Sequence, residues 1–138
     1  MLTQTQIDLV QATWAQVTPI AAQAGALFYD RLFALDPELR PLFKGDVAQQ
    51  AGKLMTMINT AVAGLDGLDR LVPAVMDLGR RHVGYGVRDA HYDTVGAALL
   101  WTLEQGLGDA FTAEVKDAWA AVYGVLADVM KQGAAQAA

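Results

Sequence analysis

Apolar residues recur at intervals of three and four along almost the whole chain, which is the spacing of one face of an α-helix. One long stripe occupies residues 54–65, and similar stripes occupy residues 71–82, 95–103 and 115–129. We find no sustained two-residue alternation of the kind that indicates strands. The pattern predicts one all-α domain of about seven helices. A simple four-helix bundle is the alternative, although a short proline-started segment after Asp36 favours a more irregular packing.

Short local signals predict where the helices begin and end. Thr3 and Gln6 have the spacing of a capping box, and Asp36-Pro37 combines an N-cap with proline at the first helical position. Thr112 is placed to cap the final helix. From Gly133 onward the alanine- and glutamine-rich tail, residues 133–138, is expected to fray.

Composition excludes several classes of protein. The 138 residues suit a single domain over 1–138, and only 18% of them are charged against about 25% in ordinary globular chains, which indicates an interior that holds more than its own side chains. The net charge of −5 argues against a nucleic-acid partner. No cysteine is present, and no apolar run predicts membrane insertion. The amino terminus lacks a secretory pattern, so we expect a cytoplasmic protein.

His82 is the more informative of the two histidines in the chain. It follows Leu78 by four residues and therefore shares an apolar helix face with it. One interpretation is a buried histidine whose ring is bonded to a backbone carbonyl. The other is a metal ligand through Nε2, with Nδ1 held by a carbonyl near Leu78. One imidazole suffices only for a metal already held by a porphyrin, so this interpretation requires haem.

Several stretches, in order, carry a family resemblance over about residues 5–130. The chain resembles the globins, and within them the single-domain bacterial haemoglobins that are related to the globin domain of flavohaemoglobins. The resemblance implies a globin fold of about seven to eight helices around a pocket for haem b, iron protoporphyrin IX. The matching stretches are Leu27-Phe28-Tyr29-Asp30-Arg31-Leu32-Phe33, Asp36-Pro37-Glu38, Leu42-Phe43, Gly79-Arg80-Arg81-His82, Tyr85-Gly86-Val87, Ala90-His91-Tyr92, Ala118-Trp119 and Val122-Tyr123-Gly124.

The resemblance also implies roles for individual residues. His82 is similar to the proximal iron ligand, and Tyr29 and Gln50 resemble the distal pair that faces a bound gas. His91 is expected to begin a helix and not to bind metal. The other residues expected to line the cofactor are Phe43, Lys53, Leu54, Met57, Leu78, Arg81, Tyr85, Val87, Tyr92 and Val95.

Several of these assignments have structural alternatives. Tyr29 could be an ordinary core tyrosine with its hydroxyl at the surface, and Gln50 a solvated helix residue. Gln49 is the neighbouring choice for the distal amide, but Gln50 shares the apolar stripe with Leu54 and Gln49 does not. The basic residues near the propionates, Lys53 and Arg81 among them, could equally be solvated surface charges.

The tail departs from the pattern of flavohaemoglobin-type globins, which carry a glutamate that bonds the proximal histidine. Here the tail reads Lys131-Gln132-Gly133 with no glutamate, and Asp128 has the wrong phase on the helix to replace it. Strongly oxygen-activating chemistry is therefore not expected.

The resemblance leaves three functions open. The first is high-affinity binding of dioxygen, and of nitric oxide and carbon monoxide, at a five-coordinate iron. The second is a nitric oxide dioxygenase that converts nitric oxide and dioxygen to nitrate with an external flavin reductase. The third is a haem-free sensor of globin shape. We expect a monomer or a weak homodimer.

Overall fold

The computed structural model describes residues 2–42, 46–84 and 89–137. Six α-helices and four short 3-10 helices account for nearly all of them, and these residues contain no strand. The all-α prediction is therefore confirmed. The elements in chain order are α1 (Gln4–Val17), η1 (Thr18–Ile20), α2 (Ala21–Leu35), η2 (Pro37–Leu42), α3 (Val47–Ala63), η3 (Leu65–Gly67), α4 (Leu68–Gly84), α5 (Asp89–Leu107), η4 (Gly108–Ala110) and α6 (Ala113–Ala137).

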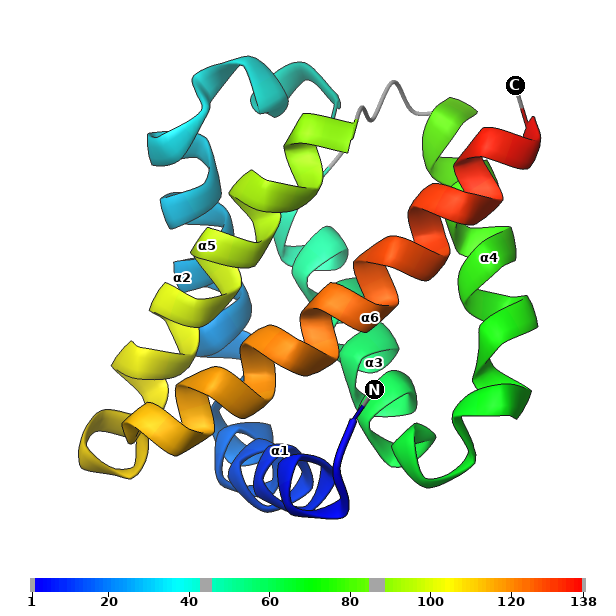
Figure 1. Ribbon diagram of the computed structural model, residues 1–138. Helices are drawn as coiled ribbons and strands as arrows, with labels where there is room; N and C mark the ends of the chain where they lie inside the picture. The colour runs from blue at the N-terminus through cyan, green and yellow to red at the C-terminus, as the bar shows by residue number, and fades with distance from the viewer. Residues whose placement is uncertain (1, 43–45, 85–88, 138) are drawn as a thin grey trace.

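The helices cross one another instead of lying parallel as in a four-helix bundle. In Figure 1, α6 runs obliquely across the molecule, with α2 and α5 side by side on one flank and α4 on the other. Helix α1 lies across the lower end, where it meets α3 and the first half of α6. This is the irregular packing that the sequence predicted in preference to a four-helix bundle. None of the described helices is both long enough and apolar enough to cross a lipid bilayer.

The predicted caps are present. The Thr3 hydroxyl oxygen accepts from the Gln6 backbone N–H at 3.1 Å while the Gln6 side chain accepts from the Thr3 backbone, which completes the capping box. Thr112 accepts from the Val115 N–H at 3.3 Å. Helix α6 continues through Ala137, and Gly133 is buried. Fraying of the tail, residues 133–138, stays a prediction.

Two tryptophans join α1 to α6 in the core. The Trp14 and Trp119 rings lie 5.9 Å apart between centroids and are inclined by 58°. Each buried indole N–H has a partner, since Trp14 donates to the Asn59 amide oxygen at 3.1 Å and Trp119 donates to the Thr13 hydroxyl at 2.9 Å. These bonds avoid the cost of a buried polar group without a partner. They also tie α1 to α3 and to α6.

Helices α2 and α3 approach closely at a glycine. A Cβ atom placed on Gly25 would lie 2.8 Å from the Cβ of Ala51, closer than packed carbon atoms allow. The crossing therefore requires the hydrogen that glycine has in place of a side chain. It also sets the spacing between Tyr29 on α2 and Gln50 on α3.

We expect Gly25→Ala to destabilise the protein, although alanine is the better helix former. Overpacking costs about 1–3 kcal/mol, which outweighs the gain of up to about 1 kcal/mol in helix propensity. Gly52→Ala on α3 is the matched control, because nothing lies within 4 Å of a Cβ there, and it should be neutral or stabilising. Urea unfolding of both variants measures the difference. Equal stabilities would contradict the close packing at Gly25.

Candidate functional site

His82 lies in the last turn of α4 and is half-buried. Its Nδ1 donates a hydrogen bond to the Leu78 carbonyl oxygen at 2.7 Å. Since a carbonyl only accepts, the bond places the proton on Nδ1 and makes Nε2 the ring nitrogen suited to ligating a metal. Both interpretations of His82 from the sequence expected such a carbonyl contact, so the bond alone does not separate them.

The surroundings of His82 favour its neutral form. Burial lowers the pKa of His82 below the ordinary value of 6.5, and the Arg81 guanidinium lowers it further, while the Leu78 carbonyl opposes them. A neutral imidazole is the form that binds a metal ion. At neutral pH the ring is therefore in the protonation state that ligation needs.

This lowered pKa makes the haem-free protein sensitive to acid. The unfolded chain takes up the His82 proton near the ordinary 6.5, above the folded-state pKa. The stability contribution is complete above that pH and is lost as the pH falls from there through the folded-state pKa. Urea unfolding at about pH 8 and about pH 5 should show a smaller loss in His82→Gln, which has no proton to gain. An equal loss in both proteins would contradict the direction of the shift.

Tyr29 is buried between α2 and α3, with only 4% of its surface exposed. Phe28 contacts it edge-on at 5.1 Å, and Phe33 lies 5.8 Å away between ring centroids. Its hydroxyl donates to the Gln50 backbone carbonyl at 3.5 Å, a long and therefore weak hydrogen bond. Burial raises the pKa of Tyr29 to about 12, so the hydroxyl keeps its proton at neutral pH. Tyr29 thus places a donor beside α3 and not at the surface.

The candidate site residues on α3 lie on two faces of the helix. Gln50 and Leu54 are half-buried, and Leu54 packs against the core, whereas Gln49 is exposed. This agrees with the choice of Gln50 over Gln49 as the inward amide. Lys53 and Met57, which were predicted to line the cofactor, are exposed, and 37% of the Met57 surface is accessible.

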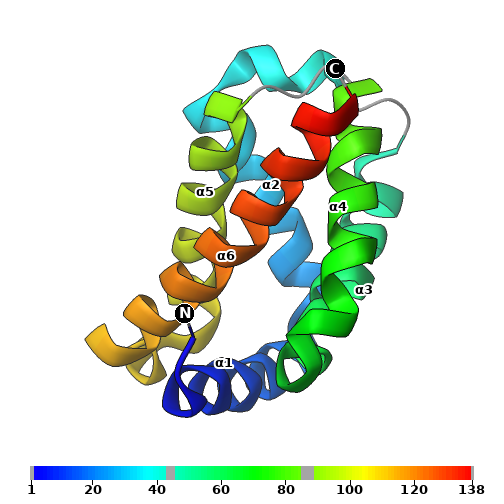
Figure 2. The same ribbon diagram turned by 45° about the vertical axis from the view of Figure 1, so that its right-hand side comes forward.

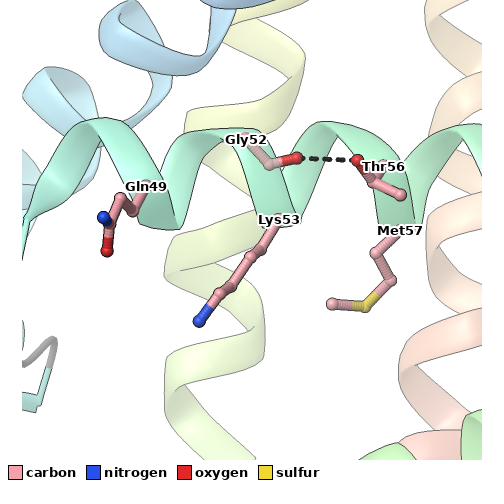
Figure 3. A pocket seen from close by; sticks show the side chains of 5 residues that line it. All are labelled: Gln49, Gly52, Lys53, Thr56 and Met57. Carbon is pink, nitrogen blue, oxygen red and sulfur yellow. Dashed lines mark hydrogen bonds between the residues drawn. The ribbon is translucent and has the colours of Figure 1, made fainter.

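An open depression of about 620 Å³ lies along this outer face of α3. Figure 3 shows the Gln49, Lys53 and Met57 side chains extending to the same side of the helix, one turn apart. Its volume lies within the range of about 300–1,000 Å³ for small-molecule sites. The described lining consists of Gln49, Gly52, Lys53, Thr56 and Met57. Gln50 and Leu54 are not part of it.

Tyr92 on α5 is buried and is held by residues of α6. The Tyr123 hydroxyl donates to the Tyr92 carbonyl oxygen at 2.6 Å, and the Lys131 ammonium lies 5.6 Å from the Tyr92 ring centroid. Burial raises the pKa of Tyr123, and Tyr92 and then Asp93 raise it further, so this hydroxyl stays protonated. Val95, one turn after Tyr92, packs half-buried against the core. The α6 segment that lacks the glutamate of flavohaemoglobin-type globins therefore presents a cation to Tyr92.

The structure describes only some of the remaining predicted site residues. Phe43, Tyr85 and Val87 lie outside the described residues. Leu78 is half-buried and supplies the carbonyl to His82, whereas Arg81 is exposed and pairs with Asp77 at 3.4 Å. An exposed ion pair of this kind contributes about 0–1 kcal/mol.

His91 is the third residue of α5 and is buried, which agrees with the expected place at a helix start.

Sequence reasoning did not find three of these contacts. The Tyr29–Gln50 bond, the Lys131–Tyr92 contact and the close approach of α2 to α3 all join residues that are far apart in the chain. No local pattern signals them.

The described residues fit a haem. Burial favours the neutral form of the His82 ring, and the bond from Nδ1 to a carbonyl leaves Nε2 as the atom that would hold a porphyrin iron. Tyr29 supplies a buried hydroxyl donor, and Leu54 supplies an apolar side chain next to Gln50 on α3. These features are those of a helical protein that could hold haem and so bind small gaseous ligands.

The chain belongs to the globin family. The family model described as "Globin" matches residues 26–130. A haem cofactor and small gaseous ligands such as dioxygen are the general properties of this family, and the fold observed here is its all-α fold.

Three curated relatives are neuroglobins from fish. Neuroglobins from Chaenocephalus aceratus and Dissostichus mawsoni are each 31% identical to the chain, in alignments that cover 96% of it and 92% of the relative. The neuroglobin from Tetraodon nigroviridis is also 31% identical, over 91% of this chain and 88% of its own length. These comparisons support the family but not the narrower likeness to bacterial haemoglobins.

Proposed function

We propose that the protein binds dioxygen reversibly and with high affinity at a five-coordinate haem iron that is ligated by His82, with Tyr29 and Gln50 as the distal donors. The observation that carries the proposal is the Tyr29 hydroxyl, which is buried, protonated, and placed against the Gln50 segment of α3. When bound, the haem supplies an iron whose open position takes a diatomic gas.

The chain's own residues supply the selectivity. His82 stays neutral and oriented because Nδ1 is bonded to the Leu78 carbonyl. Tyr29 offers an O–H and Gln50 an amide N–H to a polar ligand, and such bonds are worth more where water is excluded. Leu54 contributes apolar surface that helps to exclude water. Two donors in a dry site favour tight binding and slow release of dioxygen.

Further parts of the proposal concern the cofactor and its setting. We expect haem b, with Lys53 and Arg81 near the propionates, and Tyr92 and Val95 on the proximal side. A cytoplasmic location, a monomer or weak homodimer, and kinship with single-domain bacterial haemoglobins also remain predictions.

Optical spectra of the purified protein in the ferrous, dioxygen-bound and ferric states test this function directly. We expect a Soret band, a five-coordinate ferrous spectrum, and a slow return to it when dioxygen is removed. A protein that shows no Soret band even after added haem would be a haem-free sensor of globin shape. A six-coordinate ferrous spectrum without gas would contradict the open iron position.

Nitric oxide dioxygenation would use the same donors and is therefore tested separately. The dioxygen-loaded protein is mixed with nitric oxide in a stopped-flow instrument, and nitrate is measured. Repeated turnover with an added flavin reductase would make the protein a nitric oxide dioxygenase instead of a dioxygen carrier. A single turnover that leaves ferric protein unreduced supports the carrier.

A further inference from the structure

Helices α4 and α6 approach each other at two glycines until their backbones touch. A Cβ atom on Gly79 would overlap the carbonyl oxygen of Met130 and lie 2.7 Å from its carbonyl carbon. Reciprocally, a Cβ atom on Gly133 would overlap the carbonyl oxygen of Met76 and lie 2.7 Å from its carbonyl carbon. The obstructing atoms belong to the backbone, so no side-chain rotation makes room for a methyl group.

The two contacts form one antiparallel crossing. Met76 and Gly79 run in one direction along α4, and their partners Gly133 and Met130 run in the opposite direction along α6. Figure 2 shows α4 beside the last turns of α6, and Gly79 and Gly133 are both buried. Glycine inside a helix costs about 1 kcal/mol relative to alanine. The close approach of the two backbones, which permits weak Cα–H···O contacts between the helices, offsets that cost.

The crossing lies next to the group that orients His82. The Leu78 carbonyl that accepts the proton of His82 belongs to the peptide unit that joins Leu78 to Gly79. Gly79 is also three residues before His82, so both side-chain directions lie within about 60° around the helix. Any displacement of α4 from α6 at Gly79 therefore moves the carbonyl and the imidazole together.

We propose that Gly79 and Gly133 are positioning residues for His82, which set the place of its imidazole by holding α4 in backbone contact with α6. The inference rests on the proposed role of His82 as the haem ligand. It adds that the last turns of α6, through Gly133, set the position from which the His82 imidazole would bind the iron.

The test uses Gly79→Ala, Gly133→Ala and the double variant, with Gly124→Ala as the control. Gly124 is also on α6, and nothing lies within 4 Å of a Cβ there. The readout is the iron–histidine stretching band of the ferrous protein in resonance Raman spectra, which reports on the bond to His82. Haem-free protein is unfolded in urea in parallel, so that packing is measured without the cofactor.

We expect the band to shift in both single variants and to stay in place in Gly124→Ala. Haem loss should become faster by about tenfold or more in the single variants. In the double variant, we expect the band shift and the rate of haem loss to be no larger than in the more affected single variant. The two substitutions separate the same pair of helices, so their effects should not add.

Gly133→Ala is the deciding variant, because Gly133 lies outside α4 and the backbone that its Cβ would meet is that of Met76 on α4, the helix that carries His82. If Gly79→Ala fails to fold, Gly133→Ala alone still tests the inference. A destabilised haem-free protein with an unshifted band would mean that the glycines serve packing only, and would overturn it. Haem binding that survives loss of His82 would instead overturn the proposed function and leave the packing result intact.

Discussion

His82→Ala is expected to abolish stable haem binding and with it the uptake of gas. Only the imidazole supplies the proposed bond from this chain to the iron, and changes to groups that merely orient such a ligand already weaken affinity by about 10–100-fold. We therefore expect the loss to exceed about 100-fold. Haem titration of the haem-free protein, followed at the Soret band, measures it.

The second histidine provides the matched control for this experiment. His91 is buried at the start of α5, so His91→Gln tests the loss of a buried imidazole without loss of the ligand. It should bind haem with little change. Added imidazole should restore a haem spectrum in His82→Ala by filling the space left by the side chain. Unchanged colour and gas uptake in His82→Ala would disprove the assignment.

Tyr29→Phe is expected to speed the release of dioxygen by about tenfold, with a range of severalfold to about 100-fold. Removing the hydroxyl would leave the bound dioxygen without its hydrogen-bond donor, and a buried polar group that loses its partner costs about 1–3 kcal/mol. In the structure this hydroxyl bonds weakly to the Gln50 carbonyl at 3.5 Å, so turning it to a ligand costs little. Stopped-flow displacement of dioxygen by carbon monoxide measures the rate.

Tyr123 on α6 gives a control with the same chemical change. Tyr123→Phe removes the hydroxyl that donates to the Tyr92 carbonyl at 2.6 Å, a short bond between α6 and α5. We expect this variant to lose stability but to release dioxygen at nearly the original rate. A faster release from Tyr123→Phe than from Tyr29→Phe would mean that the distal assignment is wrong.

Much of the fold could be predicted because its signals are local. A cap at Thr3 or Thr112 depends on the next three residues, and a stripe depends on one helical turn. The segment after Asp36 was harder, because Pro41 lies within it and cannot donate to an α-helical ladder. It forms the 3-10 helix η2, and six α-helices result where about seven were predicted.

The site could be predicted only in part for the same reason. His82 and its Leu78 carbonyl lie four residues apart on one helix, so spacing alone brought them together. The packing of Gly133 against Met76 was not predicted, because the two residues are remote in sequence. The narrower bacterial assignment relied on stretches that also fit a family containing neuroglobins.

The contact of Gly133 with α4 has a practical consequence. Its last turns lie in backbone contact with the helix that carries His82. We expect a bulky fusion or insertion next to Gly133 to change the colour and the gas kinetics by displacing α4, whereas one next to the exposed capping box of Thr3 and Gln6 should leave them unchanged.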